Sequence, residues 1–120
     1  MPGLTTTVQV HSRKAATNPS VTVVDIEGEL SDEHADALGA ELHQQMRLGR
    51  TKIVLNFEKT TFLTTRGIAE CAAAAKRLRD RGGDLKIANA RGDVWRVIEM
   101  VWLHRMITCY PGVNEAVREF

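Results

Sequence analysis

The chain has 120 residues, of which 43% are hydrophobic and 26% charged. This is typical of a single compact domain, residues 1–120, and excludes a wholly disordered chain. Sixteen Lys and Arg residues against fifteen Asp and Glu residues leave a net charge of +1, and only 5% of residues are aromatic, so we expect no nucleic-acid partner. No stretch approaches the roughly 20 apolar residues that span a bilayer, and the first seven residues do not resemble a signal peptide. We therefore expect a cytoplasmic location and no membrane insertion.

Two strands are predicted at the start of the chain. Thr5–Arg13 places Val8 and Val10 on one face and polar residues on the other, which is the period of a half-exposed strand. Val21–Gly28 is rich in β-branched residues and predicts a second strand. The Asn-Pro pair at 18–19 is a turn signal, which indicates that the two strands are antiparallel.

A helix and then a central strand are predicted next. Ser31 is expected to cap the helix and Gly49 to end it. Lys52–Phe57 is a short, nearly continuous apolar run, which is typical of a strand that is covered on both faces. The inward positions of the helix recur at helical spacing and are Ala35, Leu38, Leu42 and Met46.

The second half of the chain alternates helices with strands. The apolar pair Phe62 and Leu63 precedes a second helix, which begins near Thr64–Gly67 and ends at the glycine pair 82–83. The elements after it are expected over Asp84–Ala88 (strand), Arg91–Leu103 (helix), Met106–Cys109 (short edge strand) and Val113–Phe120 (helix). The inward residues are expected to be Ile68, Cys71, Ala72, Ala75 and Leu78 in the second helix, and Val94, Val97, Ile98 and Val101 in the third.

This order of elements predicts the fold class. Strands that alternate with helices favour an α/β sandwich. We expect a mixed, mostly parallel β-sheet of four to five strands with about four helices. The first two strands should form its antiparallel edge.

Sequence patterns for catalysis are few. The chain has no nucleophile elbow, phosphate loop or dinucleotide fingerprint, and its histidines lack metal-ligand spacing, so we expect no enzyme, no metal and no cofactor. Cys71 and Cys109 are too few for a disulfide framework and are expected to be small apolar residues in a reducing compartment. A nucleophile–base pair of Cys71 and His104 is a catalytic alternative, although Cys71 falls on an apolar helix stripe, where thiols are usually inert.

Charge is distributed unevenly along the chain. Between Asp25 and Glu41 there are seven acidic residues and no Lys or Arg, whereas Lys76–Arg81 holds four basic residues and one acidic residue. Two solvated helix faces are the simpler interpretation. A polarised surface that orients a protein partner is the functional one.

The segment Thr61–Ile68 is the most informative for function. It joins an apolar stretch to a helix N-terminus, where unpaired backbone N–H groups point outward. Thr64 or Thr65 can cap this helix. Simple capping and a docking loop whose charge state matters both account for the pattern.

The chain as a whole resembles the STAS domain, which is the fold of bacterial anti-sigma factor antagonists and of the cytoplasmic tails of sulfate transporters. The matching pieces occur in family order: VTVVDIEGEL (21–30), KIVLNFEKTTFLTTRGIA (52–69), AAKRLRDRGGDLKIANA (74–90) and NEAVREF (114–120). The resemblance implies a STAS-like sandwich and a non-enzymatic regulator. Such an antagonist docks onto an anti-sigma factor, which is also a serine kinase, and so frees a sigma factor.

The resemblance also implies a site at the start of the second helix. There the kinase phosphorylates the Ser or Thr directly before Gly, in a pattern close to Asp-Ser-Ser/Thr-Gly-Leu. In this chain Arg66 occupies the acceptor position, so the usual switch is expected to be lost, and Thr64 and Thr65 are the possible phosphorylation sites. The expected partner-binding residues are Phe62, Leu63, Thr64, Thr65, Arg66 and Gly67.

Two other interpretations stay open at this point. The chain resembles STAS subunits of larger assemblies, such as a lipid-transport ATPase or a stress-signalling complex, in which case an ATPase subunit is the expected partner. A small-ligand-binding protein or enzyme would instead use a cleft near Cys71 and His104.

Overall fold

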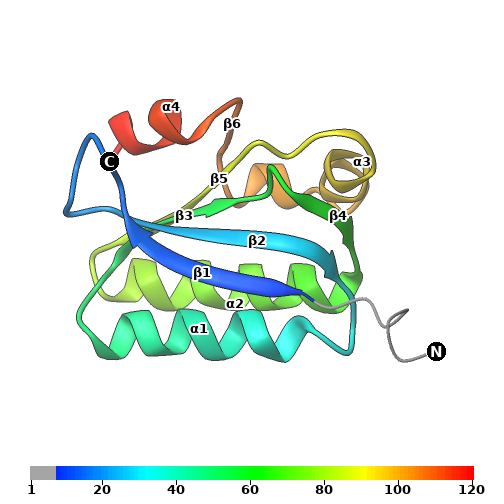
Figure 1. The fold of residues 1–120 in the computed structure, drawn as a ribbon, viewed down its shortest axis with the longest axis horizontal. Coiled ribbons are helices and arrows are strands. Elements are labelled where there is room, and N and C mark those ends of the chain that lie inside the picture. Colours follow the sequence, from blue (N-terminus) through cyan, green and yellow to red (C-terminus); the bar gives the residue numbers. More distant parts are fainter. Residues whose placement is uncertain (1–7) are drawn as a thin grey trace.

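The computed structural model describes residues 8–120 and contains one mixed β-sheet of six strands (Figure 1). The strands are β1 (Gln9–Lys14), β2 (Thr22–Leu30), β3 (Lys52–Asn56), β4 (Thr60–Leu63), β5 (Asp84–Ala88) and β6 (Cys109–Tyr110). Five of them lie in the order β1-β2-β3-β5-β6, and β4 pairs with β2 outside this row. β1 is antiparallel to β2, and the other pairs are parallel.

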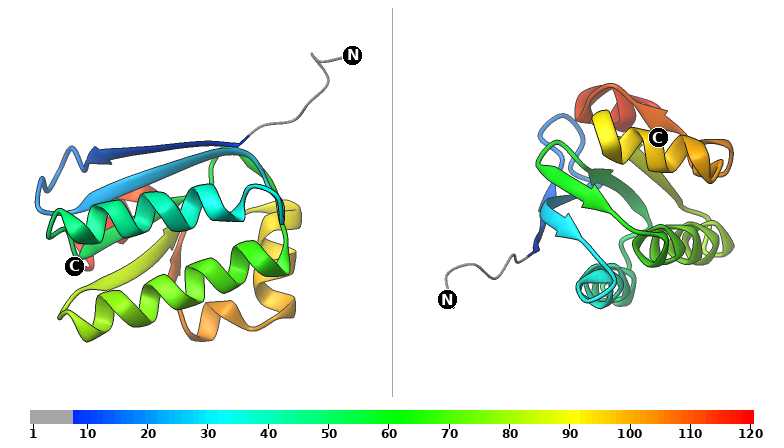
Figure 2. Two further views of the ribbon diagram at one scale, coloured as in Figure 1. Left: turned by 90° about the horizontal axis from the view of Figure 1, so that it is seen from below. Right: turned by 90° about the vertical axis from the view of Figure 1, so that its right-hand side faces the viewer.

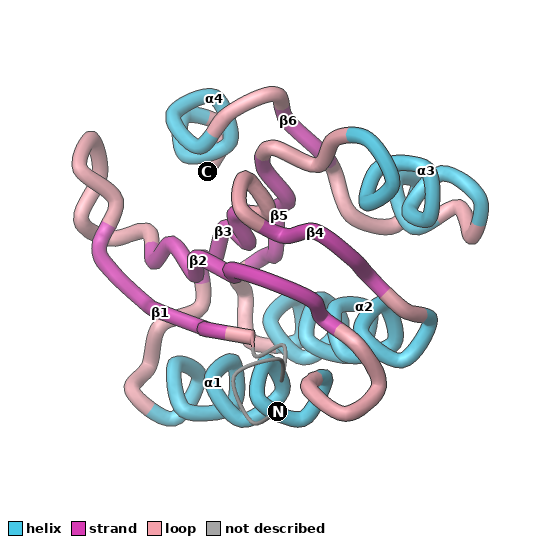
Figure 3. Tube along the Cα trace, turned by 45° about the vertical axis from the view of Figure 1, so that its right-hand side comes forward, coloured by secondary structure: helices cyan, strands magenta, loops and turns pink. Residues whose placement is uncertain are grey.

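Helices cover both faces of the sheet (Figure 2). They are α1 (Ala35–Arg47), α2 (Thr65–Asp80), α3 (Gly92–Met100) and α4 (Val113–Arg118), with the short 3₁₀ helix η2 (Leu103–Arg105) after α3. α1 and α2 pack side by side on one face, and α4 lies on the other. Figure 3 shows α3 at the end of the sheet where α2 begins.

The two faces bury separate hydrophobic clusters. The larger cluster lies against α1, α2 and α3, and the smaller one lies under α4. β3 serves both clusters, because Ile53 and Leu55 belong to the larger cluster and Val54, which points to the opposite face, belongs to the smaller one. This explains why the strand is almost continuously apolar, as predicted.

β2 is the longest strand because it has two parallel partners. Its first half pairs with β3, and its end, Gly28–Leu30, pairs with β4 after a register shift between Gly28 and Glu29. Gly28 has a φ of +101°, a backbone conformation that side chains disfavour, and its N–H donates to the Lys59 carbonyl oxygen at 2.9 Å. The bend carries the end of β2, together with β4, toward the start of α2 (Figure 1).

The predicted order of elements is confirmed, with one strand added. β4 was not expected, because Phe62 and Leu63 were assigned only to the segment that precedes the second helix. Only Thr60 and Leu63 of this strand are buried, so it lacks the continuous apolar run that marks β3. Its pairing with β2 is a long-range contact that local periodicity does not reveal. The predicted start of the first strand, residues 5–7, lies outside the described residues.

The start of α1 differs from the prediction. His34 is the N-cap and makes no side-chain capping bond, so the prediction that Ser31 caps this helix is wrong. The Ser31 hydroxyl lies 3.1 Å from His34 Nδ1 instead. The Ser31 side chain therefore orders the turn before the helix.

The end of α3 also differs from the prediction. The helix stops at Met100, and Val101, which was expected to face inward, is 41% exposed. Trp102 adopts a left-handed conformation with φ +65°, and this ends the helix before Leu103 can continue it. Among residues 8–120, no helix is both long enough and apolar enough to cross a membrane.

Candidate functional site

Thr64 holds the loop between β4 and α2 in place. Its N–H donates to the Leu30 carbonyl oxygen at 3.1 Å, which extends the β2–β4 pairing by one residue. Its hydroxyl accepts a hydrogen bond from the Gly67 N–H at 3.4 Å and donates to the Leu30 carbonyl oxygen at 3.3 Å. Thr64 is therefore the N-cap of α2, and both hydrogen-bonding functions of its hydroxyl are in use.

Leu63 and Gly67 form the inner side of this loop. Leu63 is only 2% exposed. A Cβ atom on Gly67 would lie 3.0 Å from Leu63 Cδ1 and 3.1 Å from Leu30 Cδ2, so the absence of a side chain lets the helix start close to the sheet. These two predicted partner-binding residues thus support the loop from within the core.

Three predicted residues form the outer side of the loop. Thr65 and Arg66 are exposed in the first turn of α2, and Phe62 is 46% exposed on β4. Thr64 lies half-buried beside them. We call Phe62, Thr65 and Arg66 the loop surface, because they are the exposed predicted residues of this segment.

Arg66 is tied to the first helix. Its Nη2 atom donates to Asp36 Oδ1 in the first turn of α1, and the two side chains are 51% and 72% exposed. Asp36 was not among the predicted site residues. Its only sequence signal is its place in the acidic run after Asp25, which does not identify it individually.

The acidic run itself does not form a single surface. Asp25 follows Val23 by two residues along β2 and therefore faces the α4 side of the sheet, whereas Asp32, Glu33 and Asp36 are exposed near the start of α1. The predicted polarised surface is thus reduced to the start of α1, next to Arg66.

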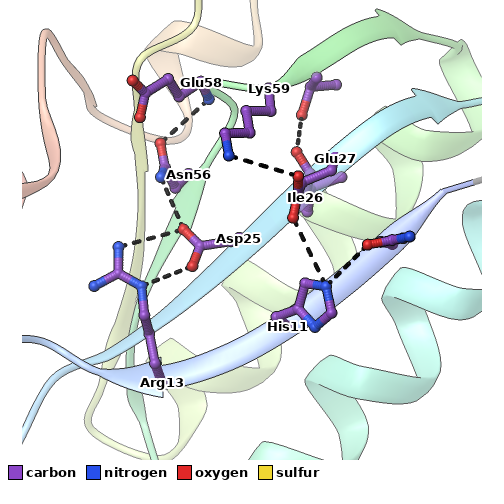
Figure 4. Close-up of polar contacts among 10 residues, drawn as sticks. His11, Arg13, Asp25, Ile26, Glu27, Asn56, Glu58 and Lys59 are labelled. Atoms are coloured by element: carbon purple, nitrogen blue, oxygen red, sulfur yellow. Dashed lines mark hydrogen bonds and ion pairs between the residues drawn. The ribbon is translucent and has the colours of Figure 1, made fainter.

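A polar network on the α4 side of the sheet was missed by sequence reasoning (Figure 4). Asp25 on β2 accepts hydrogen bonds from Arg13 Nε at 2.7 Å and from Asn56 Nδ2 at 2.8 Å. Asn89 Nδ2 in turn donates to Asn56 Oδ1 at 2.9 Å, and Arg91 Nη2 donates to Asn89 Oδ1 at 2.9 Å. The network therefore joins β1, β2 and β3 to the loop after β5.

This network favours the ionised form of the Asp25 carboxyl group. Burial alone would raise the pKa of Asp25, but the hydrogen bonds from Arg13 and Asn56 and the charge of Arg13 outweigh burial and hold that pKa below its ordinary value. A cavity of about 220 Å³ lies beside Asp25, with Glu27, Glu58 and Lys59 in its wall. Two ion pairs lie in the wall: Arg13 with Asp25 at 2.7 Å and Lys59 with Glu27 at 3.8 Å (Figure 4).

The two residues of the catalytic alternative lie in different surroundings. Burial raises the pKa of the fully buried Cys71 thiol to about 12, so it stays protonated at neutral pH. His104 packs edge-on against Trp95, with ring centroids 5.6 Å apart. Within residues 8–120, no cluster of three or more His, Cys, Asp or Glu side chains could hold a metal ion.

Solved structures with this fold include regulators and part of a transporter. An anti-sigma factor antagonist from Mycobacterium paratuberculosis is 22% identical, with a TM-score of 0.83 over 94% of this chain and 93% of that chain. The phosphorylated Bacillus cell fate determinant SpoIIAA is 18% identical, with a TM-score of 0.69 over 92% and 98%. A murine anion transporter of solute carrier family 26 is 14% identical, with a TM-score of 0.69 over 94% of this chain and 22% of the transporter.

These identities are low, so the likeness to the solved structures concerns the fold. A comparison with curated protein sequences found no match. The STAS domain family matches residues 12–116, which include every strand from β2 onward, α1 to α3 and most of α4. The chain therefore belongs to the STAS domain family.

Proposed function

We propose that this protein is a non-enzymatic regulator of the anti-sigma factor antagonist type. In this proposal it acts in the cytoplasm and docks through its loop surface onto an anti-sigma factor that is also a serine kinase. Docking would release a sigma factor and so regulate transcription. The fold shared with the mycobacterial antagonist supports this proposal, as does the exposure of Thr65 and Arg66 at the start of α2.

This proposal depends on the presence of an arginine at position 66. By the family pattern it occupies the position of the phosphoacceptor, and it lacks the hydroxyl to which a serine kinase transfers phosphate. The hydroxyl of Thr64 is engaged in capping, and that of Thr65 lies one residue before the acceptor position. A phosphate adds about −1.5 to −2 charges at a helix start, whereas Arg66 supplies a permanent positive charge there. We therefore infer a permanently competent binder, controlled by its amount or by the state of its partner.

Co-purification from native extract tests the proposal. Recovery of a kinase-like ATPase with the tagged protein, identified by mass spectrometry, is the expected result. Arg66→Glu should then weaken binding to the purified partner by about tenfold or more, because like charges across an interface cost several kcal/mol. Arg118→Glu is the matched control, since Arg118 is an exposed arginine on α4, on the opposite face of the sheet. Equal losses in the two variants would argue against docking through the loop surface.

A second candidate function is a subunit of a larger assembly. The observation in its favour is that the same fold forms 22% of the murine transporter chain. In this case a transporter ATPase, and no kinase, should co-purify with the protein. The Arg66→Glu comparison with Arg118→Glu applies unchanged to that partner.

A further inference from the structure

Exposed hydrophobic side chains are concentrated in one short stretch. Of the six large hydrophobic residues that are exposed within residues 8–120, four lie between residues 100 and 106. The other two are Leu48 at the end of α1 and Phe62 on β4. Clustered apolar side chains in solvent mark interaction sites, whereas single ones are ordinary. We call these four residues, which are close in sequence, the α3–η2 apolar patch: Met100 (69% exposed), Val101 (41%), Trp102 (60%) and Met106 (40%).

The backbone holds Trp102 outward at an energetic cost. Its φ of +65° and ψ of +24° lie in the left-handed region, which bulky residues rarely adopt and glycine adopts freely. The Trp102 N–H donates to the Glu99 carbonyl oxygen at 3.2 Å, and its own carbonyl oxygen accepts from the Arg105 N–H at 3.1 Å, so this turn is well defined. Packing in the core does not explain why a tryptophan occupies this position, since its side chain is exposed. A strained, exposed tryptophan points instead to a role in contact with another molecule.

Positively charged side chains border the patch. Arg105 lies over the Trp102 ring, with its Cζ atom 4.4 Å from the ring centroid. Arg79 on α2 donates to the Met106 carbonyl oxygen at 2.6 Å, which places η2 beside the basic end of α2 (Figure 2). Arg79 is already paired with Asp84, but Lys76, one turn earlier on α2, and Arg105 have no carboxylate partner among the described residues. Arg105, which lies over the Trp102 ring and forms no ion pair among the described residues, therefore offers its positive charge to an acidic partner.

We propose that the α3–η2 apolar patch docks an acidic amphipathic helix of a partner protein. Tryptophan, methionine and arginine are the residues enriched in protein–protein interfaces, where aromatic and arginine anchors dominate the binding energy. An amphipathic helix would place its apolar face on Trp102 and Met100 and its carboxylates toward Arg105 and Lys76.

Other occupants fit the patch less well. Recognition of anionic lipid usually needs four to eight clustered Lys and Arg residues, whereas Arg105 is the one such residue between positions 100 and 106. A second copy of the chain offers carboxylates on Asp32, Glu33 and Asp36, but no exposed large hydrophobic side chain lies among them. The composition of the patch therefore favours a different protein.

A displayed library of random peptides, each about 16 residues or roughly four helical turns, tests this proposal. The library is selected on the wild-type protein alone. The enriched peptides should carry Leu or Phe at helical spacing together with Asp and Glu. They should bind Trp102→Gly and Met100→Ser at least about tenfold more weakly than the wild type, and more weakly in high salt. Leu48→Ser, which removes an equally exposed residue at the end of α1, and Arg66→Glu should bind them like the wild type.

The stability of Trp102→Gly separates docking from folding. Because glycine relieves the left-handed strain and the tryptophan ring is exposed, this variant should melt at the wild-type temperature or above it. A clearly lower melting temperature of both Trp102→Gly and Met100→Ser would overturn the proposal, since the side chains would then serve the fold. So would the absence of enriched peptides, or the enrichment of basic peptides. If the wild-type protein self-associates and Trp102→Gly does not, the patch binds a second copy of the chain. If the wild-type protein pellets with phosphatidylglycerol vesicles and Trp102→Gly does not, the patch binds a membrane. Either outcome would overturn the proposal.

Discussion

Arg66 at the start of α2 forms an ion pair with Asp36 at the start of α1, 30 residues away in the sequence. The pair joins the two helices that cover one face of the sheet (Figure 2). Both side chains are more than half exposed, so the pair contributes little to stability and its charges are accessible to a partner. Arg66 thus has two potential roles, one within the chain and one in docking.

A charge swap separates these two roles. In the double variant with Arg66→Asp and Asp36→Arg, the internal pair is kept but the charge at the start of α2 is reversed. We expect the free energy of unfolding to stay within about 1 kcal/mol of the wild-type value, as for exposed ion pairs. Affinity for the co-purified partner should fall below the wild-type affinity, as it does in Arg66→Glu. Urea denaturation and calorimetric titration measure the two quantities. Wild-type affinity in the swapped variant would mean that the internal pair, and not the charge of Arg66, supports docking.

Restoring the family pattern should restore the phosphorylation switch. We expect Thr64→Asp combined with Arg66→Ser to accept one phosphate on the introduced serine when it is incubated with the kinase partner and ATP, and then to bind that partner more weakly. Aspartate is as good an N-cap as threonine, so α2 should start at the same place. Mass spectrometry locates the phosphate.

The unchanged protein is the control for this experiment. It should take little or no phosphate on Thr64 or Thr65, because shifting a hydroxyl by one or two residues at a helix start moves it out of line with the γ-phosphate. Stoichiometric phosphate on Thr65 would show that the switch is shifted and not lost. A double variant that binds the kinase without being phosphorylated would indicate a different docking geometry.

Gly83 is expected to be indispensable for the connection between α2 and β5. A Cβ atom there would lie 1.9 Å from the Thr51 carbonyl oxygen, and that oxygen already accepts a hydrogen bond from the Asp84 N–H at 3.0 Å. Gly83→Ala should destabilise the fold by about 3 kcal/mol or more, because the clash is with backbone. The neighbouring Gly82→Ala, which has a φ of +81° and open space around it, should cost only about 1 kcal/mol. Urea denaturation of both variants should show this difference, and equal losses would refute the role of the Thr51 contact.

The stabilising effect of Asp25 should depend on pH. Its pKa in the folded protein is lowered, so the unfolded chain takes up this proton first as the pH falls. The resulting stabilisation is fully present above the ordinary aspartate pKa of about 4 and is lost as the pH falls through the lower pKa of the folded state. Asp25→Asn should therefore be less stable than wild type at pH 7 by roughly 1 kcal/mol. The gap should shrink in denaturation curves recorded below about pH 4. A gap that stays constant down to pH 2 would contradict this.

Cys71 should be chemically inert in the folded protein. Because burial raises the pKa of its thiol to about 12, almost no thiolate exists at pH 8. Iodoacetamide should leave Cys71 unmodified in the native state and label it after unfolding in urea, as peptide mapping would show. The half-buried Cys109, whose pKa burial raises to about 11, is the internal comparison and should react first. Rapid native labelling of Cys71 would revive the catalytic alternative.

The fold was largely predictable because its elements carry local signals. The apolar run Lys52–Phe57, the β-branched run Val21–Gly28 and the glycines at 82–83 each mark an element or its end within a few residues. These signals depend on the period with which side chains alternate or recur, and that period is a property of short segments. The position of the candidate loop followed from the same signals together with the family pattern.

Contacts between distant segments could not be predicted in this way. The pairing of β4 with β2, the ion pair of Arg66 with Asp36 and the hydrogen bond of Asn56 to Asp25 each join residues about 30 positions apart. The exposure of Val101 was likewise decided by the left-handed turn at Trp102, which interrupts the helical period. The sequence by itself thus determined which segments are strands and helices, because their periodicity is local. Only the tertiary structure decided which charges meet and which apolar side chains remain in solvent, because both depend on how those segments pack in space.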